Sequence, residues 1–271
     1  MLWSYRMAKA RQQQFFKGRL PQQYNENLLV PLEGEDLHAF EQADGNELAE
    51  KMRSPHSSSA LCVNFFLYWK RHALTDFLKV FGHVVFGRTV PVGSPCSLRF
   101  ETKHRFGSTP ERRIIRGKAG NIDLDVRIGS SHAILAESKF TEVFTTEVRE
   151  ISDVNTERYR RAFSSVFLCD SASLLDGQRE TKFRQLAQRL LYTVDSANPV
   201  FRAIPARRML FLYYDHDGFD RDLLKFPELV REEYRDAVVV LSYQDLFARI
   251  RAELDASAHR RYFEYMADRY F

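Results

Sequence analysis

The fold is decided by one stretch, which reads Asn121-Ile-Asp-Leu-Asp-Val-Arg-Ile128, Gly129-Ser-Ser-His132 and Ala133-Ile-Leu-Ala-Glu-Ser-Lys139. Apolar and polar residues alternate in the first part, which predicts a strand with Asp123, Asp125 and Arg127 on one face. The last part predicts a second strand, on which Glu137 and Lys139 share a face. Because the connection is short enough for a hairpin, the acidic groups and the lysine are expected to converge.

This combination suits the chemistry of a bound divalent cation. Mg²⁺ prefers oxygen ligands and usually takes one or two carboxylates together with water and phosphate. Asp123 and Glu137 supply two carboxylates, and Lys139 can hold a water molecule or offset charge on a scissile phosphate. Glu-x-Lys also occurs at Glu101 and Glu180, but only the copy at Glu137 follows an apolar strand and a strand with aspartates. The layout therefore predicts phosphodiester hydrolysis.

Asp123 followed by Glu137-Ser-Lys139 resembles the signature of the PD-(D/E)XK nuclease superfamily, whose members have the restriction-endonuclease-like fold. Ser57-Ser-Ser-Ala-Leu-Cys-Val-Asn-Phe65 resembles the first core helix of one bacterial branch, and Lys139-Phe-Thr-Glu142 resembles that branch's extension of the lysine motif. The resemblance implies a Mg²⁺-dependent nuclease acting on DNA, in which Mn²⁺ can substitute. It also implies that Asp123 and Glu137 bind the metal and that Lys139 acts in catalysis.

A later stretch, Gln185-Leu-Ala-Gln-Arg-Leu-Leu-Tyr192, is similar to the glutamine-bearing helix of such nucleases. Gln188 and Tyr192 also match the Gln-x-x-x-Tyr pattern of exonuclease-like members. A turn of about 100° per residue places Gln185, Gln188 and Tyr192 on one stripe, opposite an apolar face. The stripe either lines a cleft, where Gln185 and Gln188 assist catalysis, or is an ordinary solvated face.

Two features depart from the superfamily pattern. Many members carry a glutamate in the first helix as an additional metal ligand, but no acidic residue occurs between Lys51 and Thr75. Asp125, a second acid, lies two positions after Asp123, so it is an alternative to Asp123 as the principal metal ligand. The analogy favours Asp123 and gives Asp125 an auxiliary role.

Two basic groups flank the acidic strands in the sequence. The first comprises Arg105, Arg112, Arg113, Arg116 and Lys118, and the second comprises Arg158 and Arg161. Basic segments beside a metal site are typical of phosphate contacts, so both groups are predicted to bind the nucleic-acid backbone. The formal net charge is only +4, which by itself would not indicate nucleic-acid binding.

Composition places the chain among globular proteins, with 271 residues, of which 44% are hydrophobic and 28% charged. The three cysteines are far apart, which favours neither disulfides nor a zinc knuckle. No stretch approaches the roughly 20 apolar residues of a membrane span, and the N-terminus lacks the apolar core of a signal peptide. We therefore expect a cytoplasmic protein without membrane contact.

The order of predicted elements indicates an α/β fold with a central mixed β-sheet flanked by helices and a helical C-terminus. The resemblance implies that its core is restriction-endonuclease-like. Residues 1–55 are predicted to form an irregular N-terminal arm, with a short helix near residues 37–52, and residues 56–271 a nuclease-like domain. Strands are predicted at residues 98–104, 122–128, 133–140, 208–214 and 237–241. Helices are predicted at residues 60–81, with Gly82 at the end, and at residues 156–168, 181–194, 219–235 and 243–271.

Two other functions compete with the nuclease hypothesis. A nucleic-acid-binding or scaffold protein could keep the fold without cutting, but it would have no need of the intact Asp, Glu and Lys set. A glycosidase with paired acids would leave Lys139 and the basic segments without a role. The sequence leaves open the cut site, endonuclease or exonuclease mode, RNA as substrate and a homodimeric state.

Overall fold

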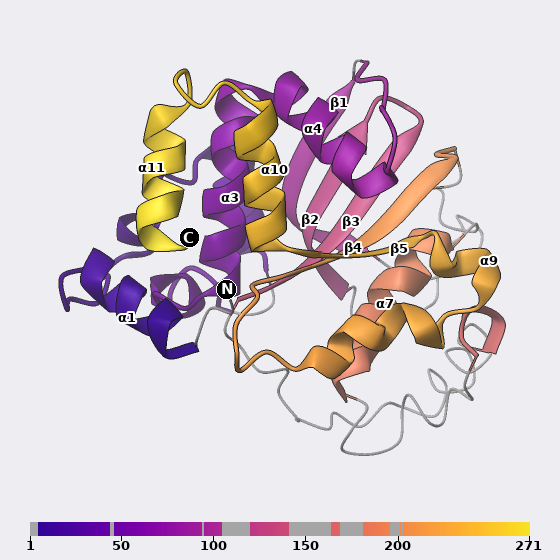
Figure 1. Cartoon of the computed structure of the whole chain (residues 1–271), viewed down its shortest axis with the longest axis horizontal. Coiled ribbons are helices and arrows are strands. Elements are labelled where there is room, and N and C mark those ends of the chain that lie inside the picture. The colour runs from indigo at the N-terminus through magenta and orange to yellow at the C-terminus, as the bar shows by residue number, and fades with distance from the viewer. Residues whose placement is uncertain are drawn as a thin grey trace.

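The computed structural model describes residues 5–43, 46–93, 95–104, 120–140, 164–168, 181–195, 201 and 203–271. A five-stranded mixed sheet with the order β1-β2-β3-β4-β5 lies at its centre (Figure 1). The first three strands pair antiparallel, and β4 and β5 continue the sheet parallel to β3. The strands are β1 (Cys96–His104), β2 (Gly120–Ile128), β3 (His132–Lys139), β4 (Ala206–Tyr213) and β5 (Val238–Ser242). Each lies close to its predicted position, which confirms the predicted fold class.

Helices cover both faces of this sheet (Figure 1). The larger core lies between the sheet and α3 (Ser58–His72), α4 (Leu74–Phe86), α10 (Tyr243–Glu253) and α11 (Arg260–Arg269). The smaller core lies between the sheet and α7 (Thr181–Val194) with the 3-10 helix η3 (Arg221–Leu229). Alternate residues of β4 serve the two cores, since Leu210 belongs to the first and Phe211 to the second. The sheet is therefore the middle layer of a three-layer α/β fold.

The predicted single helix over residues 60–81 is wrong, because the chain leaves helical geometry at Ala73, with φ −155° and ψ 48°. The break lets α4 fold back along α3. Trp69 then stacks on Phe77 with ring centroids 5.6 Å apart, and Phe66 contacts Phe81 at 5.5 Å. In one straight helix, residues eight apart would be separated by about 12 Å along the axis. Aromatic packing therefore outweighs the local helical preference, and no glycine or proline marks the break.

Gly82 was predicted to end that helix, but it lies inside α4, and Gly87 caps the helix instead. Gly87 has φ +66°, a conformation that glycine adopts at low cost. A Cβ atom at Gly82 would lie 3.1 Å from Ile128 Cδ1 and 3.2 Å from Val90 Cβ. Gly82 therefore permits a close approach of α4 to the sheet.

The N-terminal segment is more ordered than predicted. It contains α1 (Tyr5–Phe15), the 3-10 helices η1 (Tyr24–Asn27) and η2 (Lys51–Arg53), and α2 (Gly34–Glu41). The predicted helix near residues 37–52 is therefore wrong, since α2 ends at Glu41. Ala8, Leu32 and Phe40 join the same buried cluster as the C-terminal helices. The division of the chain at residue 55 stays a prediction.

The remaining predicted helices are only partly as expected. Residues 219–235 form η3 and the short α9 (Glu232–Arg235) rather than one α-helix, and η3 contains Pro227, which lacks the backbone N–H that an α-helix needs. Residues 243–271 are mainly helical, as predicted, and form the two helices α10 and α11. Most of the helix predicted at residues 156–168 lies outside the described residues. Within the described ranges, no helix is long and apolar enough to span a membrane.

Candidate active site

The pairing of β2 with β3 stops at the acidic motif. The ladder runs from Ile128 opposite His132 to Leu124 opposite Ala136. Beyond this pair, the backbone amide of Ser138 donates a hydrogen bond to Asp123 Oδ2 at 2.7 Å. A side-chain carboxylate thus accepts a main-chain N–H where the strands separate. This contact fixes Asp123 beside the residues that follow Ala136.

Glu137 lies between two cations. Lys139 Nζ is 2.9 Å from Glu137 Oε1, and Arg189 Nε, from α7, donates to Glu137 Oε2 at 2.8 Å. Burial opposes the ionisation of Glu137, but the charges of Lys139 and Arg189 and their hydrogen bonds outweigh it and lower the pKa of Glu137. Glu137 is therefore charged at neutral pH although it is only 2% exposed.

Asp123 has the opposite balance. Burial raises its pKa, and the negative charge of Glu137 raises it further, while Lys139 and Arg189 and the Ser138 amide act against this rise. Apart from the Ser138 amide, no hydrogen-bond donor reaches Asp123 in the described ranges, so its Oδ1 atom is free to bind a ligand. The structure thus brings Asp123, Glu137 and Lys139 together, as the sequence predicts.

Asp125 does not belong to this group. Its carboxylate accepts hydrogen bonds from Arg127 Nε at 2.6 Å and from Arg99 at 3.1 Å, and His104 Nε2 lies 3.3 Å away. Burial would raise the pKa of Asp125, but the contacts with His104 and Arg127 outweigh it and lower the pKa to about 2. Because both oxygens already have cationic partners, Asp125 is poorly placed to bind a metal ion.

The regular alternation of faces expected for β2 also breaks at Asp123. Leu124, Val126 and Ile128 pack in the larger core, but Ile122 packs on the other face, in a cluster with Leu135 and Tyr192. The same point of β1 is distorted. The β1–β2 ladder omits the pair formed by Glu101 and Asp123, and Glu101 has φ +47°. Sequence periodicity therefore could not place Asp123 and Asp125 correctly relative to each other.

On α7, the residue that contacts the candidate site is Arg189. Gln185 is exposed, Gln188 is partly buried, and no hydrogen bond joins either to Asp123, Glu137 or Lys139 in the described ranges. Tyr192 is buried in the cluster with Ile122. Arg189 follows Gln185 by four residues and so lies on the same helical stripe. That spacing was the signal from which the sequence could have identified it.

The N-terminus of α3 supports the motif from the other face. Ser57 caps this helix by accepting a hydrogen bond from the Ala60 amide at 3.1 Å. Ser58 Oγ accepts a hydrogen bond from the Phe140 amide at 2.9 Å, just beyond Lys139. Ser138 Oγ lies 2.7 Å from the Tyr243 hydroxyl of α10. The strand that carries Glu137 and Lys139 is therefore anchored to two helices.

Several predicted residues cannot be placed. Arg105, Arg112, Arg113, Arg116, Lys118, Arg158 and Arg161 lie outside the described residues, as do Glu142 and Cys169. Cys62 and Cys96 are free thiols. In the described part of the chain, no group of three or more His, Cys, Asp and Glu side chains is arranged to hold a metal ion. A cation at this site would therefore need water or substrate oxygens besides the carboxylates.

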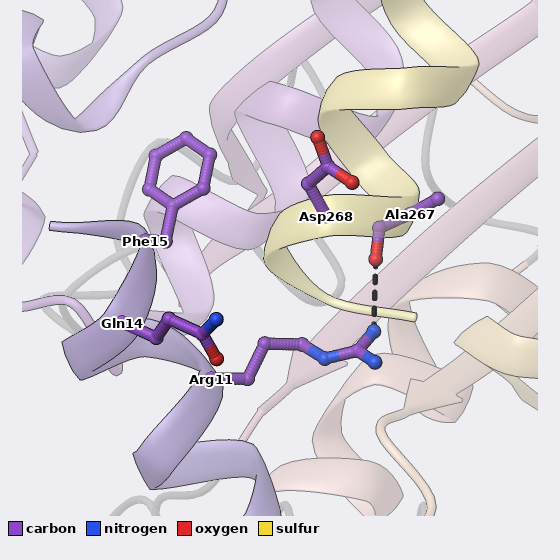
Figure 2. Close-up of a pocket in the computed structure, with 5 residues that line it drawn as sticks. All are labelled: Arg11, Gln14, Phe15, Ala267 and Asp268. Atoms are coloured by element: carbon purple, nitrogen blue, oxygen red, sulfur yellow. Dashed lines mark hydrogen bonds between the residues drawn. The ribbon is translucent and has the colours of Figure 1, made fainter.

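A surface pocket lies elsewhere, between α1 and α11, with a volume of about 400 Å³. Figure 2 shows its lining residues, among which Arg11 donates a hydrogen bond to the Ala267 carbonyl at 2.8 Å. Asp123, Glu137 and Lys139 do not line it. We assign no function to this pocket, because the reactive side chains lie elsewhere.

Residues 6–271 match the model of a protein family described as restriction endonuclease associating with ARP. The chain belongs to this family. The match covers almost the whole sequence and confirms the resemblance to the restriction-endonuclease-like superfamily, to which the mixed sheet with flanking helices conforms. Membership in a restriction-endonuclease family indicates nuclease chemistry. No curated protein and no solved structure matches the chain.

Proposed function

We propose that the protein is a Mg²⁺-dependent nuclease that hydrolyses phosphodiester bonds of DNA, and that Mn²⁺ can replace Mg²⁺. The observation that carries the proposal is the convergence of Asp123, Glu137 and Lys139 where β2 and β3 separate. Membership in a restriction-endonuclease family supports the same reaction class. We place this activity in the cytoplasm, in keeping with the two free thiols.

Asp123 and Glu137 are suited to hold the cation. Mg²⁺ is usually bound by only one or two carboxylates, with water and substrate phosphate as its other ligands, so two acids are enough. Asp123 offers an oxygen that no donor reaches within the described part of the chain, and Glu137 is kept ionised by Lys139 and Arg189. When bound, the cation would supply positive charge for the scissile phosphate and favour deprotonation of a bound water.

Lys139 has a separate role in this proposal. Its side chain is 15% exposed and its ammonium group contacts Glu137. From this position it can orient a water molecule by hydrogen bonding and offset the charge that develops on the phosphate. Arg189 acts as a positioning residue, because it holds the second oxygen of Glu137.

The other candidate residues receive supporting roles. We assign Asp125 to the ion-pair cluster with Arg99, Arg127 and His104 rather than to the metal. Gln185 and Gln188 are proposed to assist substrate binding from α7. The arginines and lysine between residues 105 and 118 and Arg158 with Arg161 are proposed to contact the DNA backbone.

A cleavage assay tests the proposal. Purified protein is incubated with plasmid, linear duplex and single-stranded DNA in the presence of Mg²⁺, Mn²⁺ or EDTA. We expect metal-dependent cutting that Asp123→Ala and Lys139→Ala each reduce by about 10²-fold or more. Lys225→Ala, which removes an exposed lysine paired with Asp222, should cut like the wild type. Equal activity of Lys139→Ala and Lys225→Ala would refute the assigned site.

One observation favours a second candidate, a DNA-binding protein that does not cut. Both oxygens of Glu137 are already bound, by Lys139 and by Arg189, and a metal ion would have to compete with these cations. Such a protein would bind DNA with the same affinity in EDTA and in Mg²⁺. It would leave plasmid, linear duplex and single-stranded DNA uncut. Binding without cleavage would therefore select this candidate.

A further inference from the structure

Glu101 of β1 is a largely buried acidic residue whose carboxylate has no hydrogen-bond or ion-pair partner among the described residues. It is 8% exposed, so nine-tenths of it is withdrawn from solvent. No hydrogen bond and no ion pair joins its carboxylate to any residue in the described ranges. A buried acid normally has a cation or several donors, because burying an uncompensated charge is costly. Glu101 therefore lacks the compensation that the structure gives to Asp125 and Glu137.

The position of Glu101 is tied to that of Asp123. The two residues would be opposite each other in the β1–β2 ladder, but this pair is missing between Phe100–Leu124 and Thr102–Ile122. Glu101 is also one of three non-glycine residues with positive φ in the described ranges. Such a conformation is strained for a residue with a side chain and occurs preferentially at functional sites. Both strands thus depart from regular geometry at the same two acids.

The charges around Glu101 are mainly negative. After burial, the groups that raise its pKa are Asp123, Glu47 and Glu137, while Lys51 lowers it. Asp123, the predicted metal ligand, is among these charged neighbours and would be opposite Glu101 in the β1–β2 ladder, so Glu101 lies beside the candidate site. A positive charge between Glu101 and Asp123 would reduce the repulsion between their carboxylates.

Glu47 differs from Glu101 although both are buried glutamates of the same neighbourhood. Lys51 Nζ lies 2.6 Å from Glu47 Oε1, and the Ser59 hydroxyl donates to Glu47 Oε2 at 2.7 Å. Both oxygens of Glu47 are therefore occupied, whereas those of Glu101 are not. This contrast makes Glu47 a matched control.

We propose that Glu101 is a ligand of the divalent cation and shares it with Asp123. The inference rests on the proposed function, since it takes Asp123 as a metal-binding residue. Oxygen ligands from two facing carboxylates, completed by water, suit a hard cation such as Mg²⁺ or Mn²⁺. Glu101 also belongs to Glu101-Thr-Lys103, which repeats the spacing of Glu137-Ser-Lys139.

Direct Mn²⁺ binding to the full-length protein without DNA tests the inference, with electron paramagnetic resonance to count free Mn²⁺. We expect Glu101→Gln to weaken Mn²⁺ binding by at least about tenfold, because loss of even an indirect contact to a metal ligand costs about 10–100-fold. Glu47→Gln should bind Mn²⁺ within about threefold of the wild type, since its oxygens are bound elsewhere. Unchanged Mn²⁺ affinity of Glu101→Gln would overturn the inference.

The melting temperature in EDTA distinguishes a metal-binding role of Glu101 from a purely structural one. Glu101→Gln removes a repelling charge, so its melting temperature in EDTA should equal or exceed that of the wild type, while the rise caused by Mn²⁺ shrinks. Glu47→Gln should melt lower, because Lys51 and Ser59 lose their charged partner. A lower melting temperature for Glu101→Gln in EDTA would contradict the inference.

Two further results separate this inference from the proposed function. Glu101→Gly removes the carboxylate and suits positive φ, so it provides a folded variant if Glu101→Gln is insoluble, and it should lose Mn²⁺ affinity similarly. In one outcome, the wild type cuts DNA in a metal-dependent way while Glu101→Gln and Glu101→Gly both keep the full Mn²⁺ affinity of the wild type. This pair of results would overturn the role of Glu101 and leave the proposed nuclease function intact. A wild-type protein that binds no Mn²⁺ at millimolar concentration would overturn both.

Discussion

Two aspartates separated by a single residue show how environment decides the role of a side chain. Burial and the negative charge of Glu137 raise the pKa of Asp123, although the Ser138 amide donates a hydrogen bond to it. Asp125 lies among Arg99, His104 and Arg127, so its pKa falls to about 2. Asp123 keeps an oxygen for the proposed metal ion, whereas the oxygens of Asp125 are already paired with the guanidinium groups of Arg99 and Arg127. Similar residues thus divide between chemistry and stability.

The pKa of Asp125 leads to a prediction about stability and pH. Its folded value of about 2 lies below the unfolded value near 3.9, so its charge stabilises the fold above pH 4. This contribution, about 2 kcal/mol, should be lost as the pH falls from about 4 to 2. Asp125→Asn should therefore be less stable than the wild type at pH 7, and the difference should shrink at low pH. Urea unfolding at pH 7, 4 and 3 measures it.

Other carboxylates also titrate in this range, so the quantity to compare is the difference between the wild type and Asp125→Asn at each pH. A difference that stays constant from pH 7 to pH 3 would show that Asp125 does not carry the charge effect. Glu35→Gln, which changes an exposed acid of α2, should give almost no difference at any pH.

Sequence patterns predicted that Asp123, Glu137 and Lys139 lie together, because strand periodicity and hairpin spacing are local properties. They could not identify Glu101, whose relation to Asp123 depends on pairing between β1 and β2 and on a distortion with φ +47°. They also missed Arg189, although its spacing from Gln185 placed it on the predicted stripe. Residue roles that depend on contacts between distant segments therefore appeared only in the structure.

At the scale of elements, hydrogen bonds of buried hydroxyl groups join β3, and the residue that follows it, to α10 and α3. Ser138 of β3 bonds to Tyr243 of α10, and Ser58 of α3 bonds to the Phe140 amide. Tyr243 and Ser138 are fully buried, so each hydroxyl has only protein partners nearby. These hydrogen bonds fix the direction of the strand on which Glu137 and Lys139 lie.

Removal of the Tyr243 hydroxyl should measure this link. We expect Tyr243→Phe to lower the free energy of unfolding by about 1 kcal/mol, because a buried hydrogen bond is lost with little change in volume. Ser138→Ala should cost a similar amount, and the double variant should cost less than the sum, since one bond is removed in both cases. Chemical denaturation of the four proteins gives the coupling energy. Fully additive effects would show that the two hydroxyls do not interact.

The positions of the strands along the chain could be predicted, because each has either alternating apolar residues, as in β2, or an apolar run, such as Met209–Leu212 of β4. The break at Ala73 could not, because neither His72 nor Leu74 disfavours a helix and the turn is stabilised by Trp69 on Phe77. Local preference sets the type of element, whereas packing between elements sets where it ends.

At the scale of the whole molecule, the two ends of the chain are joined through Arg269. This residue of α11 is fully buried, and its guanidinium donates to Gln12 Oε1 at 3.1 Å and to the Asn27 carbonyl at 2.7 Å. The ring of Phe16 lies 4.9 Å from the guanidinium carbon. The N-terminal segment is thus bonded to the last helix, and that helix packs beside α3, which supports the motif.

The central claim is that Asp123 and Glu137 bind one divalent cation where β2 and β3 separate. Its most direct test is a crystal structure of the full-length protein soaked in Mn²⁺, with anomalous scattering used to locate the metal. We expect a peak within bonding distance of oxygen atoms of Asp123 and Glu137, with Lys139 beside it. A fully occupied peak bound elsewhere, or no peak between these two carboxylates at saturating Mn²⁺, would contradict it.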